Sequence, residues 1–392
     1  MLRKMSQTAL GLVLALVASA TFAALPEIVA RDPGGCGLLG KLDGKRILIV
    51  SGTPEQMGAA HGVLLKAETR VTMQRVVYLV GAASTAQSGK WFFDEMAEIE
   101  RRTSPHLPKR FLAECDAMSA AAGVLQRDGR YGNLFPEKFH CSGVAVRNKA
   151  SLDGRVVHAR VLDYMRDIGL QDSAVVGVFL PDGHNAWITL GYAGFIGTVT
   201  AMNEKGLAVG EMGGRGEGNW DGMPMSFLLR DIMERADNVE EALEILKTTP
   251  RTCEYYYVFS DRSRNIAGVK ATPDEFLVLR PGEQHPELPP VPEEIVFFSG
   301  GDRAKALSQR LHDAYGKIDV QKMIEIIKRP VAMNSNLHNA IFMPESLDMW
   351  VADAGKDTVA CDEPYVHVNL RELMKFYKSQ PTADLAKSNR VD

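Results

Sequence analysis

The sequence predicts an α+β fold in which two antiparallel sheets pack together and are faced by helices as a layered sandwich. Two observations support this prediction. From residue 141 onward, short segments of strand character follow one another between turn residues. Pairs of helical segments interrupt these strands. Elements of this kind bury their apolar faces by stacking as layers.

The strand segments share alternating or continuous apolar residues bounded by turn residues. They are residues 141–148, 156–164, 174–181, 186–192, 197–203, 206–212, 254–261, 266–272, 275–280, 339–344, 347–353 and 365–370. Apolar residues at helical spacing predict one helix pair at 225–236 and from 238, and a second pair at 302–315 and 320–327.

The chain before residue 140 has a different character, because its pattern is mainly helical. Residues 55–82 and 107–123 carry apolar side chains at helical spacing. Residues 127–139 are rich in glycine, proline and charge, which indicates an exposed loop. The sequence therefore changes from helical to strand-rich near residue 140.

The composition is that of a soluble globular protein and excludes one class of partner. The 392 residues are 45% apolar and 24% charged, with a formal net charge of −4. Because the chain has no excess of basic residues, nucleic acid is not expected as its main partner.

The first 23 residues predict a secretory signal peptide. Arg3 and Lys4 precede a short apolar run at 9–18, and small residues follow to Ala23. An uncleaved membrane anchor is the alternative. No later segment is long and apolar enough to cross a bilayer, so we expect an exported protein, periplasmic or secreted, with no stable membrane span after signal removal.

The cysteines and histidines give no sign of a metal or cofactor site. The five cysteines include no CxxC pair, and the nine histidines show no metal-ligand spacing. An odd number of cysteines in an exported protein leaves at least one thiol free.

Cys141 is the candidate nucleophile, because it opens the first strand directly after the loop. A cut between His140 and Cys141 would give Cys141 a free α-amino group. An α-amine has a pKa of about 8, which suits a general base near neutral pH. One residue would then supply both the nucleophile and the base.

Two charged residues are expected beside Cys141. The segment NKASLDGR (148–155) predicts a hairpin turn, which brings residues 162 and 163 next to Cys141. Asp163 would orient the α-ammonium group, and the charge of Arg160 would lower the thiol pKa. The alternative is that Cys141 is a small buried apolar residue and that Arg160 and Asp163 form a surface ion pair.

The hairpin resembles the nucleophile hairpin of the penicillin acyltransferase-like family. The similarity lies in CSGVAVRN (141–148) and in RVLDY (160–164), where the family has Arg-Asn-Leu-Asp-Tyr/Trp. This family belongs with choloylglycine hydrolases and acid ceramidase among the N-terminal-nucleophile (Ntn) hydrolases. Val161 stands where the family usually has asparagine.

Three further segments resemble the same family. AMNEKGL (201–207) is similar to its GMNEKGL segment and implies that the backbone N–H of Asn203 lines the oxyanion hole. Residues 52–62 resemble an early G-x-P-x-x-x-G–x-x-H-G segment, and Gly301-Asp302-Arg303 resembles a late Ser-x-x-Arg site. By the same resemblance, Tyr164 and Arg303 are candidates for contact with the substrate.

The chain departs from the family at residues 295–300, where relatives carry a side-chain asparagine as an oxyanion donor. Ser299 is the candidate replacement, and Asn334, Asn336 and Asn339 lie later in the chain. Loss of one such donor typically slows a reaction about a hundred- to a thousandfold.

The resemblance implies an αββα four-layer Ntn sandwich and a chain in three parts. Residues 1–23 are the signal peptide, 24–140 a helical prosegment retained as a subunit after self-cleavage, and 141–392 the catalytic domain. The substrate would be a small acylated amide or acyl thioester, attacked through an acyl-Cys141 intermediate without cofactor or metal.

Two other functions remain open from the sequence. One is a hydrolase of bile-salt, N-acyl-homoserine-lactone or ceramide-like amides rather than an acyltransferase. The other is an exported binding or scaffold protein with weak chemistry on the same fold, which the missing asparagine would favour.

Overall fold

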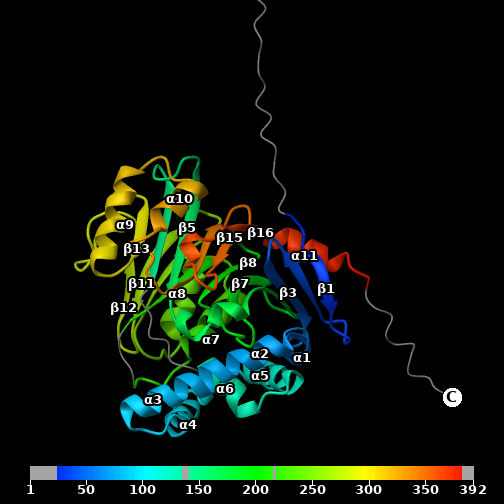
Figure 1. Ribbon diagram of the computed structural model, residues 1–392. Coiled ribbons are helices and arrows are strands. Elements are labelled where there is room, and N and C mark those ends of the chain that lie inside the picture. Colours follow the sequence, from blue (N-terminus) through cyan, green and yellow to red (C-terminus); the bar gives the residue numbers. More distant parts are fainter. Residues whose placement is uncertain (1–23, 135–140, 215–217, 382–392) are drawn as a thin grey trace, which may run out of the picture.

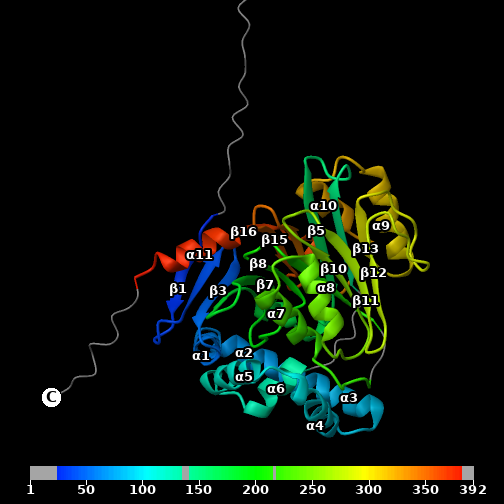
Figure 2. The ribbon, with the colours of Figure 1, turned by 180° about the vertical axis from the view of Figure 1, so that it is seen from behind.

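The sheets and helices form a layered α+β sandwich, as the sequence predicts (Figures 1 and 2). The computed structural model describes residues 24–134, 141–214 and 218–381. The signal peptide predicted at 1–23 and the residue before the proposed cut, His140, lie outside the described residues. Among the helices that are described, none combines the length and apolarity needed to span a bilayer.

The larger sheet has ten strands in the order β1-β2-β3-β6-β7-β8-β9-β10-β11-β12. All neighbours are antiparallel except β3 and β6, which are parallel, so the prediction of a purely antiparallel sheet is corrected at this one pair. The strands are β1 (Glu27–Arg31), β2 (Gly37–Leu42), β3 (Lys45–Gly52), β6 (Ala174–Pro181), β7 (Trp187–Tyr192), β8 (Thr200–Asn203), β9 (Ala208–Gly213), β10 (Tyr255–Ser260), β11 (Ile266–Ala271) and β12 (Phe276–Leu279).

The smaller sheet has six antiparallel strands in the order β13-β4-β5-β14-β15-β16. They are β4 (Ser142–Asn148), β5 (Gly154–Asp163), β13 (Ile295–Phe298), β14 (Asn336–Met343), β15 (Asp348–Asp353) and β16 (Val366–Asn369). The strand β13 at its edge is not among the segments predicted from the sequence.

The described α-helices form four groups along the chain, α1–α6, α7–α8, α9–α10 and α11. The α-helices are α1 (Pro54–Leu64), α2 (Lys66–Met73), α3 (Val80–Ser88), α4 (Phe92–Thr103), α5 (Lys109–Ala122), α6 (Gln126–Leu134), α7 (Met225–Arg235), α8 (Val239–Thr248), α9 (Gly301–Asp313), α10 (Val320–Ile327) and α11 (Leu370–Lys378). A π-helical turn, η1 (Gln74–Leu79), joins α2 to α3, and four short 3₁₀ turns complete the set: η2 (Ser104–His106), η3 (Arg166–Ile168), η4 (Leu170–Ser173) and η5 (Ala360–Asp362).

Buried apolar clusters define four layers. Side chains of β3, β6, β9 and β10 share one outer cluster with helices α1, α5, α7 and α8. On the other side of the sandwich, β4, β5 and β13 pack outward against α9 and α10. Two further clusters fill the space between the two sheets. Because side chains alternate along a strand, strands such as β4 and β10 contribute to one inner and one outer cluster.

The part of the chain before residue 140 contains more than the predicted helices. Strands β1 to β3 extend the larger sheet, so this segment is built into the sandwich. Residues 126–134, in the segment predicted as an exposed loop, form the largely buried helix α6. Its glycines pack closely, since a Cβ at Gly129 would meet Ser119 and one at Gly132 would meet Met73.

The early segment at residues 52–62 has a packing role. A Cβ at Gly58 would overlap the carbonyl oxygen of Glu114, and one at Gly62 would overlap that of Met118. These two glycines therefore let α1 lie directly against α5. The cysteines, all five of which are in described residues, form no disulfide.

We expect Gly58→Ala to destabilise the protein by about 2 kcal/mol or more. Helix propensity alone would favour alanine by about 1 kcal/mol, but the new methyl group would push the two helix backbones apart. Denaturant unfolding measures the change, with Ala59→Ser at the partly exposed neighbour as the control. A Gly58→Ala variant as stable as the parent would contradict the close packing.

Candidate active site

The β4–β5 hairpin places Cys141 beside Leu162, as its turn residues predict. Ser142 pairs with Val161 and Gly143 with Arg160, which puts Cys141 opposite the residue before Asp163. Cys141 is 4% exposed and belongs to the apolar cluster between the sheets. The hairpin thus gathers the predicted nucleophile and both of its predicted charged neighbours.

The sulfur of Cys141 is a thiol in this uncut chain. Burial raises its pKa to about 12, although the charge of Arg160 and the backbone N–H of Asp163 act in the opposite direction. A buried thiol of this pKa is a poor nucleophile near neutral pH, because almost none of it is thiolate. Attack by Cys141 would therefore require a base beside it to accept the proton.

Asp163 is held by two partners on the helical side of the smaller sheet. Its Oδ2 lies 2.8 Å from Nη1 of Arg303, and its Oδ1 accepts a 2.9 Å hydrogen bond from the backbone N–H of Met333. Burial raises the pKa of Asp163 to about 6, while these two partners lower it. The late Arg303 is thus joined directly to the predicted hairpin carboxylate.

Arg303 and Ser299 also contact the residues at the start of β4. Nη2 of Arg303 lies 3.4 Å from the carbonyl oxygen of Cys141, and the hydroxyls of Ser142 and Ser299 are 2.7 Å apart. Ser299 follows β13, which pairs with β4. The hydroxyl of Ser299 is therefore bonded to the hydroxyl of the residue that follows Cys141.

Arg160 has a partner that the sequence analysis missed. Its Nη2 lies 3.5 Å from Oε2 of Glu211, and both side chains are fully buried. Gly210 provides the space, because a Cβ there would lie 2.5 Å from Cγ of Arg160. The negative charge of Glu211 is close enough to raise the pKa of Cys141. A single acidic residue in the apolar segment 206–212 was the signal for this buried group.

The structure corrects the role expected of Asn203. Its backbone N–H donates to the carbonyl oxygen of Leu207 at 2.9 Å, and its amide nitrogen donates to the carbonyls of Met233 and Ala236. These bonds close the β8–β9 turn and tie it to the end of α7. The N–H is already used, so Asn203 is a turn-forming residue and the oxyanion role is not supported.

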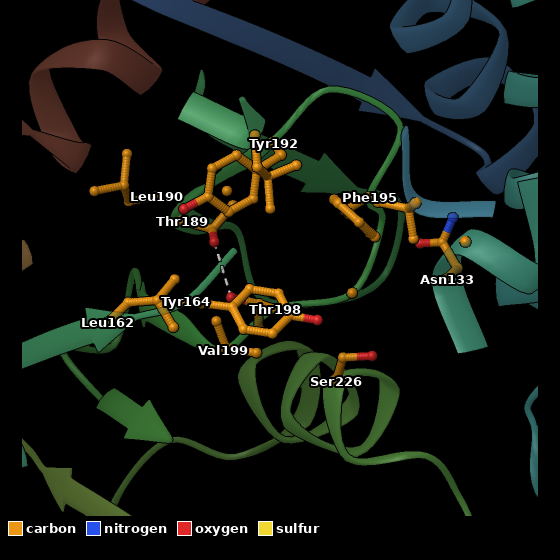
Figure 3. A pocket seen from close by; sticks show the side chains of 15 residues that line it. Asn133, Leu162, Tyr164, Thr189, Leu190, Tyr192, Phe195, Thr198, Val199 and Ser226 are labelled. Atoms are coloured by element: carbon orange, nitrogen blue, oxygen red, sulfur yellow. Dashed lines mark hydrogen bonds between the residues drawn. The ribbon is translucent and has the colours of Figure 1, made fainter. Parts of the chain in front are cut away.

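A cavity of about 670 Å³, including its open mouth, lies next to the hairpin (Figure 3). Leu162 and Tyr164, on either side of Asp163, form part of its wall. The other lining residues come from η1, α6, η4, β7, the loop that follows β7, and the start of α7. None of the described lining residues is charged, so the cavity suits an uncharged apolar group.

Parts of this chain are similar in sequence to known proteins. Residues 169–280 match the sequence model of the family described as acyl-coenzyme A:6-aminopenicillanic acid acyl-transferase. N-acylethanolamine-hydrolyzing acid amidase of Rattus norvegicus is 24% identical over 190 residues, which cover 44% of this chain and 50% of that protein. This chain is related to Ntn amidohydrolases and acyltransferases. The resemblance to the penicillin acyltransferase-like family is thereby confirmed.

Two further proteins are similar to this chain. Protein dcd1B of Dictyostelium discoideum is 24% identical over 368 residues, which cover 85% of this chain and 72% of that protein. The solved structure of a Caenorhabditis elegans ortholog of the acid amidase is 17% identical, with a TM-score of 0.43, over 52% of this chain and 93% of that one. The segment that matches the family model begins after Asp163, so the match does not include Cys141, Arg160 or Asp163. The roles predicted for these three residues are supported by the geometry alone.

Proposed function

We propose that the protein is an exported, self-activating Ntn cysteine enzyme, an amidohydrolase or acyltransferase. The observation that carries the proposal is the group formed by Cys141, Asp163 and Arg303 beside an uncharged cavity. In the first step the Cys141 thiol would attack the carbonyl carbon of His140. Breaking of the C–N bond between His140 and Cys141 in this step would form a thioester and free the α-amine of Cys141. Hydrolysis of the thioester would then release the thiol and the carboxylate of His140, and leave residues 24–140 as a bound subunit.

The mature site would repeat this chemistry on a substrate. The sulfur of Cys141 would attack an amide or thioester carbonyl while the α-amine accepts the thiol proton. That proton would pass to the leaving group, and water or an acceptor amine would then remove the acyl group. Asp163 would orient the α-ammonium, and the Ser299 hydroxyl would donate to the oxyanion.

The uncharged cavity favours an acylated small molecule as the substrate. Its apolar walls would bury the acyl chain, because transfer of apolar surface from water stabilises a complex. The same feature fits the alternative of a lipid-like or bile-salt amide hydrolase. Neither function requires a metal or cofactor.

The test is a panel of chromogenic N-acyl amides, with and without added acceptor amines. We expect amine release and a transient acyl adduct on the polypeptide that begins at Cys141, seen as a mass increase. Acylated acceptor would identify a transferase, and free acid a hydrolase. A chain that remains uncut and forms no adduct would instead support the binding or scaffold function.

We expect the acyl-transfer rate to fall as the pH is lowered through about 6. Burial raises the pKa of Asp163 to about 6, so the carboxylate that orients the α-ammonium is present above that pH and is protonated below it. The α-amine, with a pKa of about 8, also ceases to act as a base when it is protonated, so kcat/KM should fall about tenfold per pH unit below about 8 and more steeply below about 6. Asp163→Asn should lower the plateau and remove the steeper part. A steeper part that persists in Asp163→Asn would assign it to another group.

A further inference from the structure

The loop between β7 and β8, residues 193–199, forms one wall of the cavity. Phe195, Thr198 and Val199 of this loop line the cavity. Gly194 has φ of +90°, and a Cβ there would lie 2.7 Å from Cε of Met73 at the end of α2. The loop is therefore packed against the part of the chain that precedes the proposed cut.

Side chains bond all four polar backbone groups of Gly194 and Ile196. The N–H of Gly194 donates to Nε2 of His61 at 3.0 Å. The amide of Asn133 donates to the carbonyl oxygen of Gly194 and accepts from the N–H of Ile196, both at 2.9 Å. The carbonyl oxygen of Ile196 accepts a 2.7 Å hydrogen bond from Nη1 of Arg230.

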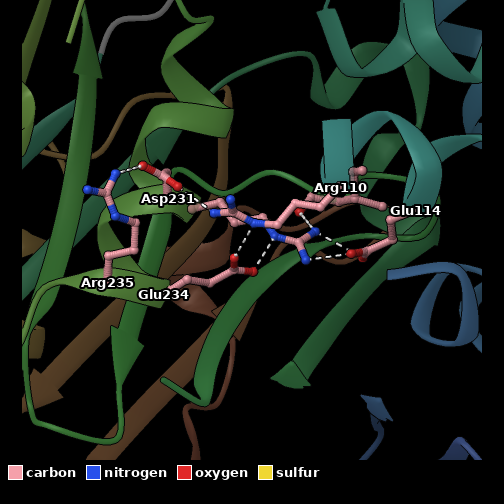
Figure 4. Close-up of polar contacts among 7 residues, drawn as sticks. Arg110, Glu114, Asp231, Glu234 and Arg235 are labelled. Atoms are coloured by element: carbon pink, nitrogen blue, oxygen red, sulfur yellow. Dashed lines mark hydrogen bonds and ion pairs between the residues drawn. The ribbon is translucent and has the colours of Figure 1, made fainter. Parts of the chain in front are cut away.

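The hydrogen bond from Arg230 to Ile196 also depends on the part of the chain before the proposed cut. Arg230 is held by Glu114 of α5 through two hydrogen bonds of 2.9 and 2.5 Å (Figure 4). His61, Glu114, Asn133 and Arg230 are each at most 6% exposed. Burial lowers the pKa of His61 to about 4, so its ring is neutral and Nε2 remains an acceptor. Water does not compete for bonds buried to this extent.

We propose that Asn133, supported by His61 and by the Glu114–Arg230 pair, positions the 193–199 loop and so sets which acyl groups the cavity accepts. This inference rests on the proposed function, because it assumes that the acyl chain of a substrate enters this cavity. Asn133 is suited to the task, since one amide presents a donor and an acceptor side by side as a peptide group does. The retained N-terminal subunit would then determine selectivity as well as structure.

The experiment compares Asn133→Leu and Asn133→Asp with the parent. The leucine variant removes both bonds at similar volume, while the aspartate variant keeps an acceptor for Ile196 and places an oxygen against the carbonyl of Gly194. The matched control is Asn185→Leu, because the amide of Asn185 bonds Ala236 and Asp237 outside the cavity wall.

Two readouts are needed. Amide hydrogen exchange at Gly194 and Ile196 should become faster by about tenfold or more in both Asn133 variants and stay unchanged in the control. The ratio of kcat/KM for long-chain to short-chain amides should change by about tenfold in both Asn133 variants. The control should keep the parent's ratio.

The outcomes separate this inference from the proposed function. Unchanged exchange would show that Asn133 does not hold the loop, and faster exchange with an unchanged chain-length ratio would show that the loop does not set selectivity. Either result overturns the inference.

If the parent hydrolyses no amide, the proposed function fails, and the affinities for a short and a long fluorescent fatty acid are measured in place of kcat/KM. A long-to-short affinity ratio unchanged in both Asn133 variants would then overturn the inference.

Discussion

Cys141→Ala is expected to leave the chain in one piece and to abolish acyl transfer. The substitution removes the sulfur that would attack the carbonyl of His140, so neither the cut nor the free α-amine can form. The methyl group fills most of the space of the side chain, which lies in an apolar cluster, and the fold should persist. Intact mass measures the cut, and release of a chromogenic amine measures the activity.

Two variants control the Cys141→Ala result. Cys141→Ser should still cut slowly, because a hydroxyl can make the same acyl shift at a lower rate. Cys253→Ala removes another buried thiol, whose pKa is also raised by burial, to about 11, and which belongs to the cluster outside the larger sheet. It should be cut normally. A Cys141→Ala chain that is still cut at residue 141 would end the self-processing proposal.

Glu114→Ala is expected to destabilise the protein by about 3–5 kcal/mol, because the buried guanidinium of Arg230 loses one of its two carboxylate partners. Glu114 and Arg230 are 0% and 1% exposed, and Glu234 is the second partner, at 2.8 Å from Nε. Figure 4 shows the wider network, in which Arg110 of α5 also meets Asp231 and Glu234 of α7.

The position of this pair gives the prediction a second consequence. Glu114 and Arg230 lie on opposite sides of the proposed cut, so Glu114→Ala should also let the two pieces separate at lower denaturant concentration. Denaturant unfolding and size-exclusion chromatography measure both effects. Glu98→Ala breaks an exposed ion pair in the same segment, with side chains 51% and 71% exposed, and should change neither. Equal effects of the two substitutions would contradict the role of the buried pair.

The hairpin was predictable because its register follows from local turn chemistry. The turn residues at 148–155 fix which residues pair, so the amino-acid sequence alone brings Cys141 and Asp163 together. Arg303 was predicted as a site residue only from the resemblance to the family. Its ion pair with Asp163 joins positions 140 residues apart, and spacing along the chain carries no signal for such a contact.

Other features depend on tertiary packing that a single sequence does not show. Glycine and charge in residues 127–139 indicated a loop, but Gly129 and Gly132 are the positions where α6 approaches its neighbours. The turn at Asn203 resembles a catalytic segment, yet its amide closes a hairpin. Glu211 was missed because the one acid in an apolar strand marks a buried charge but does not show that Arg160 faces it.

Strands β1 to β3 were missed for a related reason. Strand β3 joins the three to the rest of the sheet by pairing with β6, which begins at Ala174, more than a hundred residues after β3 ends at Gly52. Pairing over such a separation is decided by the sheet as a whole and not by local propensity. The consequence is that residues 24–134 form part of both the sheet and the cavity wall.

N-terminal sequencing of the purified protein tests the proposed self-activation most directly. The account predicts two associated polypeptides, of which the larger begins Cys141-Ser142-Gly143. A preparation in which no polypeptide begins at Cys141 would leave the buried thiol without its base and would contradict the account.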